Sequence, residues 1–130
     1  MEKTNFMDKY PVHSLIVSKE ETSFQTVDAI LEHLKTLILE HPVASYITTF
    51  DHFSHTNAIE GGVVNETIKD AKNLIFCFGK QLPSPKILAV RPRSIGVSEL
   101  EESFSLDTLE VPNEQLHKIL VEWIHSVKNK

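Results

Sequence analysis

Apolar side chains recur at three- and four-residue spacing in two parts of the chain. The first stripe consists of Phe24, Val27, Ile30, Leu31, Leu34, Leu37 and Ile38, and the second of Leu116, Ile119, Leu120, Trp123, Ile124 and Val127. This spacing places the apolar side chains on one helical face, so it predicts two amphipathic helices. Thr22 or Ser23 is the expected cap of the first helix and Asn113 of the second, and Pro42 marks the end of the first.

Shorter apolar and β-branched segments predict the strands. They cover residues 10–18, 44–50, 73–79 and 104–111. Segment 73–79 is apolar on both faces, as is typical of a central strand. Residues 87–90, shortly before Pro92, fit a strand or a single helical turn equally well. The order of these elements predicts an α+β fold, with an antiparallel or mixed sheet of about four to five strands packed against two main helices.

The expected domain organisation is one globular domain over residues 1–130, because no repeat, low-complexity segment or linker interrupts the chain. A composition of 41% hydrophobic and 24% charged residues is ordinary for a folded domain. Residues 1–9 are polar and predict a loose N-terminal tail. Between the strands at 44–50 and 73–79, a short helix from His52 to Glu60 or a loop is expected, and residues 62–72 are mostly connection.

Charge and cysteine content narrow the classes of partner and location. The net charge is −5, from 13 basic and 18 acidic side chains, and no basic cluster is present to neutralise phosphates. A nucleic-acid partner is therefore not expected. No run approaches the ~20 apolar residues that span a bilayer, so no membrane association is expected either. Cys77, the single cysteine, has no disulfide partner in the chain and is expected to be a buried, inert thiol. These features predict a cytoplasmic protein.

The segment from Phe50 to Thr56 holds the first candidate site. If a helix begins at Asp51, His52 and His55 become neighbours on one helical face. Two imidazoles and a carboxylate so placed could hold a divalent metal. The alternative is that Asp51 caps the helix and the histidines are surface groups, which is favoured because zinc sites need three or four protein ligands. The other histidines, His13, His33, His41, His117 and His125, show no ligand spacing along the chain.

The segment Arg91-Pro92-Arg93 holds the second candidate site. The rigid proline between two guanidinium groups could present a clamp for a small anion, because arginine matches carboxylate and phosphate geometry. Two solvated arginines at the end of an element are the alternative, since exposed charges contribute little energy. No phosphate-binding loop, nucleophile elbow or HExxH motif is present, and no cofactor is indicated.

Three segments carry a family resemblance, namely Phe50 to His55, Leu74 to Lys80 and Leu88 to Val97. In these segments the chain resembles a group of small uncharacterised proteobacterial proteins of about 130 residues. More distantly it resembles the bacterial domain of unknown function 302 family, through Thr26 to Asp28 and through Asp51, His52, Ala58, Gly61, Phe78, Gly79 and Pro83. That family's Gly-Thr-Pro-Leu turn is replaced by Lys86-Ile87-Leu88. The resemblance implies an α+β fold and a homodimer, and it implies no activity.

Together these patterns favour a non-enzymatic module that binds a small anionic ligand or a protein partner. Arg91 and Arg93 would hold the ligand charge, and His52, with Asp51 beside it, would add a hydrogen bond. The main alternative is a metal-dependent enzyme or metal carrier that uses Asp51, His52 and His55. A purely structural subunit of a larger complex is a third possibility.

Overall fold

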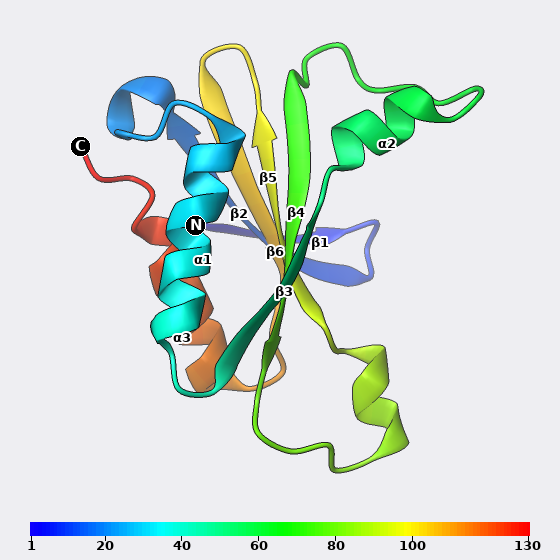
Figure 1. Ribbon diagram of the computed structural model, residues 1–130, viewed down its shortest axis with the longest axis vertical. Helices are drawn as coiled ribbons and strands as arrows, with labels where there is room; N and C mark the ends of the chain where they lie inside the picture. Colours follow the sequence, from blue (N-terminus) through cyan, green and yellow to red (C-terminus); the bar gives the residue numbers. More distant parts are fainter.

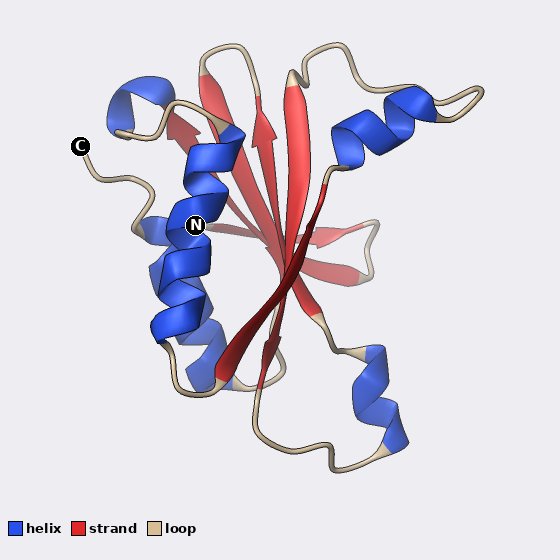
Figure 2. Ribbon diagram, in the orientation of Figure 1, coloured by secondary structure: helices blue, strands red, loops and turns tan.

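The computed structural model describes residues 1–130 and is built on a six-stranded sheet with the order β1-β2-β6-β5-β4-β3. All neighbouring strands are antiparallel. The strands are β1 (Glu2–Phe6), β2 (Tyr10–Ser18), β3 (Ala44–Phe50), β4 (Asp70–Phe78), β5 (Arg93–Glu99) and β6 (Ser103–Leu109). The helices are α1 (Val27–Glu40), α2 (His52–Ala58) and α3 (Glu114–His125), with 3-10 turns η1 (Lys19–Glu21) and η2 (Pro85–Ala89). Helices α1 and α3 lie together on one side of the sheet, whereas α2 and η2 project on the other side (Figures 1 and 2).

The two long helices cover one sheet face, and the core lies between them and the sheet. Alternate side chains of the central strands are buried there, among them Leu74 and Phe76 of β4, Ile95 of β5 and Leu106 of β6. The helices contribute buried Val27, Ile30, Leu31, Leu34 and Ile38 from α1, and Leu120, Trp123 and Ile124 from α3. The apolar stripes of the sequence therefore face the sheet, as their spacing predicts.

The ends of the long helices are set by local hydrogen bonds. The Thr26 side chain accepts from the amide of Ala29, so α1 begins later than the expected cap at Thr22 or Ser23. Thr22 is instead buried, and its hydroxyl accepts from the amide of Phe24. Asn113 caps α3 as predicted, by accepting from the amides of Gln115 and Leu116.

The α+β fold is confirmed, but the sheet has six strands and there are three α-helices, where about four to five strands and two main helices were expected. One additional strand is β1. The N-terminal residues expected to be a loose tail instead pair with β2, with Lys3 opposite His13. A tight turn at Met7 and Asp8, both with positive φ (55° and 59°), joins the two strands. Polar side chains are tolerated in β1 because it is an edge strand.

The second unexpected strand is β5, which lies between β4 and β6. Ile95 and Val97 are buried, and they alternate with Ser94, Gly96 and Ser98 on the opposite face. The prediction placed only a short strand or turn at residues 87–90, and residues 87–89 belong to η2. None of the helices combines the length and the apolar character that a membrane crossing requires.

Candidate functional site

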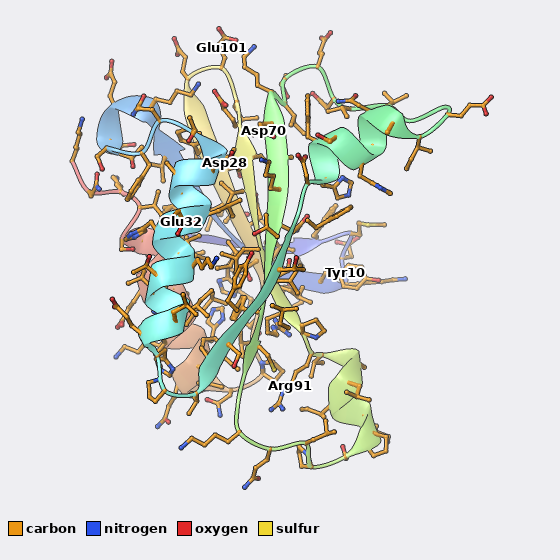
Figure 3. All side chains as sticks on the ribbon, viewed as in Figure 1. Tyr10, Asp28, Glu32, Asp70, Arg91 and Glu101 are labelled. Carbon is orange, nitrogen blue, oxygen red and sulfur yellow. The ribbon has the colours of Figure 1, made fainter.

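The predicted site residues lie in two separate places. Asp51 and His52 stand at the start of α2, directly after β3, whereas Arg91 and Arg93 flank the junction between η2 and β5. Figures 1 and 3 show α2 and the labelled Arg91 near opposite ends of the sheet. The structure therefore does not bring the four predicted ligand contacts into one site.

The segment that begins at Asp51 forms a capped helix. The Asp51 carboxylate accepts hydrogen bonds from the amide and the hydroxyl of Ser54, each at 3.0 Å. The first of these bonds is the main cause that lowers the pKa of Asp51. His52 and His55 flank the ring of Phe50, with their own ring centroids 6.2 Å apart. Asp51, His52 and His55 are not among the side chains whose ligand atoms converge as a metal set. The helix at Asp51 is thus present, and its geometry matches the capping interpretation.

Arg93 occupies a buried position in β5 and is only 7% exposed. One terminal nitrogen donates to the carbonyl oxygen of Val90 at 3.1 Å, and the other donates to those of Leu109 and Glu110 at 2.7 and 2.9 Å. Arg93 Nε–H is buried without a partner. Burial also lowers the pKa of the guanidinium. The alternative interpretation of two solvated arginines is therefore wrong for Arg93, because its side chain lies on the buried face of β5 with Ile95 and Val97.

Arg91 lies beside Gly79, at the end of β4. Its Nη1 donates to the carbonyl oxygen of Gln81, and its Nη2 lies 2.7 Å from the position that a Cβ on Gly79 would occupy. Gly79 has φ +107°, a conformation that other residues rarely adopt. The absence of a side chain at Gly79 thus leaves room for the Arg91 guanidinium beside the backbone.

Both arginines line one small cleft, which we name the arginine cleft. Its volume is about 90 Å³, and its walls are Phe78, Ile87, Val90, Arg91, Arg93, Val111, Pro112, Asn113 and Leu116. The N-terminus of α3 contributes Asn113 and Leu116, so the positive end of a 12-residue helix points to the same region. Two guanidinium groups in an otherwise largely apolar cleft can bind a small anion, and the dipole of α3 favours negative charge there, although Asn113 already caps the amides of Gln115 and Leu116.

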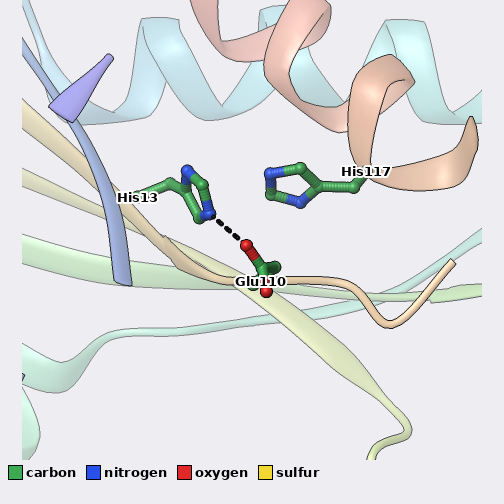
Figure 4. A group of neighbouring side chains, drawn as sticks. All are labelled: His13, Glu110 and His117. Atoms are coloured by element: carbon green, nitrogen blue, oxygen red, sulfur yellow. Dashed lines mark hydrogen bonds and ion pairs between the residues drawn. The ribbon is translucent and has the colours of Figure 1, made fainter. Parts of the chain in front are cut away.

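A second group of polar side chains, which we name the histidine–glutamate cluster, was missed from the sequence. It consists of His13 on β2, Glu110 just after β6, and His117 on α3 (Figure 4). His13 Nε2 and Glu110 Oε1 are 3.0 Å apart, and Lys3 Nζ is 3.0 Å from the same oxygen. Only the pairing of β2 with β6 brings position 13 close to position 110, so no local spacing in the chain could reveal this cluster.

His117 is the most constrained member of this cluster. Its Nδ1 accepts from the amide of Val111 at 3.2 Å, and its Nε2 is buried without a partner. Its ring centroid is 4.3 Å from that of His13. Burial, followed by the positive charge of His13, lowers the pKa of His117, and Arg93 and Lys3 act in the same direction. A neutral imidazole is therefore favoured at this position.

Cys77 differs from its expected buried state. Its residue lies on β4 and is partly exposed, because it alternates with buried Phe76 and Phe78 and so lies on the other sheet face. Its Sγ lies 3.7 Å from the carbonyl oxygen of Phe78 and has no charged partner. Cys77 lines a surface cleft together with Lys80 and Arg91, so the expectation of a buried thiol is wrong.

Comparison with known proteins gives one match. The sequence profile of DUF6858, described as a family of unknown function, matches residues 1–129. No curated protein and no solved structure matches the chain. The match confirms the expectation of an uncharacterised family. It names no substrate, cofactor or partner, so any function must come from the geometry of the sites described above.

Proposed function

The chain belongs to the DUF6858 family, and because that family has no known function, we propose one from the geometry: the protein binds a small anionic ligand in the arginine cleft. The proposal rests on the observation that the positive charges of the two arginines are not compensated by a carboxylate. Neither Arg91 nor Arg93 is paired with a carboxylate in any ion pair of the structure, although both line the same cleft.

The burial of Arg93 makes this lack of compensation costly. A charge removed from water is destabilised by several kcal/mol unless other groups replace its hydration. Three carbonyl oxygens do so in part for Arg93, and its Nε–H remains unpartnered. An anion in the cleft would supply the missing negative charge, so binding and stability are expected to be coupled.

The walls of the cleft indicate the class of anion. A volume of about 90 Å³ is roughly that of three water molecules, which suits one carboxylate or phosphate group. Phe78, Ile87 and Leu116 provide apolar surface beside the arginines. A carboxylate with a short hydrocarbon chain matches both features better than a fully ionised phosphate does. We therefore propose a short-chain monocarboxylate.

The proposal is for binding rather than catalysis. None of the lining residues is a carboxylate, histidine, cysteine, serine or lysine, which are the usual general bases and nucleophiles. Asp51 and His52 lie at the other end of the sheet and have no part in it. The protein-partner hypothesis, the homodimer, the distant relation to the domain of unknown function 302 family, the bacterial source and the cytoplasmic location remain predictions of the sequence.

Calorimetric titration of the purified protein with acetate, butyrate and phosphate at equal ionic strength tests this proposal. Equal ionic strength removes the general screening effect of salt. We expect saturable binding of butyrate, weaker binding of acetate, and at least a tenfold loss of butyrate affinity in Arg91→Gln. Lys86→Gln, which removes an exposed charge nearby in η2, is the matched control and should bind as the wild type does. Equal butyrate affinity in Arg91→Gln and the wild type would show that the cleft is not the site.

A further inference from the structure

We propose that the histidine–glutamate cluster is a binding site for a divalent transition-metal ion of the zinc class. The ligand atoms of His13, Glu110 and His117 all lie within 4.8 Å of one another. They come from β2, from the segment after β6 and from α3, so three separate elements converge on one point (Figure 4). None of its three ligands lines the arginine cleft, although the two sites adjoin, because Arg93 donates to the carbonyl oxygen of Glu110.

The donor set selects the metal. Two imidazole nitrogens and one carboxylate suit zinc, nickel or copper, whereas calcium and magnesium prefer oxygen ligands throughout. Three protein ligands fill three of the four positions of a tetrahedral zinc ion. The fourth position is then available to water or to a small ligand. Such a site differs from a closed structural zinc site, which uses four protein ligands.

Two of the three ligand atoms already have the spacing that a metal needs. Bond lengths of about 2.0–2.1 Å in a tetrahedral site place the ligand atoms roughly 3.3 Å apart. His13 Nε2 and Glu110 Oε1 are already 3.0 Å apart. Backbone pairing fixes both residues, since His13 is paired with Thr108 and the amide of Glu110 donates to Pro11 at 2.9 Å. The ligand nitrogen of His117 lies within 4.8 Å of the other two ligand atoms, so it must move closer when a metal binds.

His117 offers its lone pair at Nδ1. The Val111 amide donates to this nitrogen, so the proton of the neutral ring resides on Nε2. That hydrogen bond is 3.2 Å long, at the weak end of the normal range. The metal takes the Nδ1 lone pair in place of the Val111 amide. The Figure 4 view shows the His13 and His117 rings flanking the space beside the Glu110 carboxylate.

Lys3 competes with the metal for the Glu110 carboxylate. Its ammonium contacts the Glu110 oxygen that also contacts His13, and its side chain is 53% exposed. The ammonium can therefore move into solvent when a divalent ion binds the carboxylate. An exposed ion pair of this kind contributes little, so loss of Lys3 should tighten metal binding by roughly two- to fivefold. Variants of the three ligands should bind zinc more weakly, whereas Lys3→Gln should bind it more tightly. A purely structural cluster would not show both effects.

Calorimetric titration of the full chain, purified without a polyhistidine tag, with zinc chloride tests the proposal. We expect one equivalent of bound zinc in the wild type and at least a tenfold loss of affinity in His13→Ala and in Glu110→Gln. His55→Ala is the matched control, because His55 lies on α2 and outside the cluster, and it should bind as the wild type does. Circular dichroism before each titration confirms that the variants are folded.

Two results would overturn the proposal. The first is the absence of saturable zinc binding by the wild type, which would make the cluster a structural ion-pair group. The second is zinc binding that survives Glu110→Gln but disappears in His52→Ala or His55→Ala, which would place the metal on α2. If His13→Ala fails to fold, Glu110→Gln decides alone, since that carboxylate side chain is 37% exposed and the change is isosteric.

Discussion

Gly79 and Arg91 are in such close contact that a methyl group on the glycine would lie 2.7 Å from a guanidinium nitrogen of the arginine. The contact fixes one wall of the arginine cleft, because Arg91 lines it. It also gives a reason for a glycine at the end of β4, where φ is +107°. The backbone there must be both left-handed and free of a side chain.

This relationship predicts that Gly79→Ala loses butyrate affinity by a factor of at least five, because the displaced guanidinium no longer faces the cleft. Its unfolding free energy should fall by about 1–2 kcal/mol from the positive φ. Gly61→Ala is the matched control, since Gly61 has φ +78° with nothing within 4 Å of an added Cβ. It should lose similar stability and no affinity. Urea unfolding measures the unfolding free energy, and calorimetry measures the butyrate affinity. If Gly79→Ala and Gly61→Ala bind butyrate equally well, the role given to Arg91 is wrong.

A second prediction concerns the internal role of Arg93. Arg93→Met should lower the unfolding free energy by roughly 2–4 kcal/mol, because three carbonyl oxygens lose their donors in a buried place. Arg91→Met should cost less than about 1 kcal/mol, since Arg91 donates only to Gln81. Chemical denaturation of both variants checks the difference. Equal losses would mean that Arg93 is not the link between the start of β5 and the end of β6.

A third prediction concerns pH. Burial lowers the pKa of His33 below its ordinary value of 6.5, and its Nε2 is 2.7 Å from the hydroxyl of Ser126. The unfolded chain therefore binds more protons than the folded chain as the pH falls through about 6.5. The unfolding free energy should be highest above pH 6.5 and should decrease as the pH falls toward the lower pKa of the folded state. His33→Gln should make this decrease smaller. If the unfolding free energy of His33→Gln depends on pH as that of the wild type does, protonation of His33 is not coupled to unfolding.

The sequence supports the two long helices and several strands, because their hydrophobic spacing is strong and local. Strand β5 was missed since Arg93 and Gly96 obscure the alternation of Ile95 and Val97. The alternative interpretation of a solvated Arg93 was wrong because its burial depends on Leu109 and Glu110, which are far along the chain. The short helix after Asp51 could be anticipated from its capping residue and the glycine beyond it.

The two candidate sites differ in how far they can be predicted from the sequence. Arg91 and Arg93 could be singled out because they flank one proline, although no sequence pattern indicates that the N-terminus of α3 lies beside them. His13, Glu110 and His117 could not be associated, since 97 residues separate the first two and only sheet pairing unites them. Long-range pairing of this kind leaves no periodic trace in a single sequence.

The order of strands also has a consequence for biosynthesis. Strand β2 emerges early from the ribosome, yet one of its two neighbours in the sheet is β6, the last strand to be made. The chain between them can form the β3–β4 and β4–β5 ladders as it appears, because those partners are close in sequence. The nascent β1–β2 hairpin must wait, with Leu15 and Val17 uncovered, until Phe104 and Leu106 arrive. Closure of the sheet at β6 is thus a late step, and until it occurs aggregation of the growing chain competes with folding.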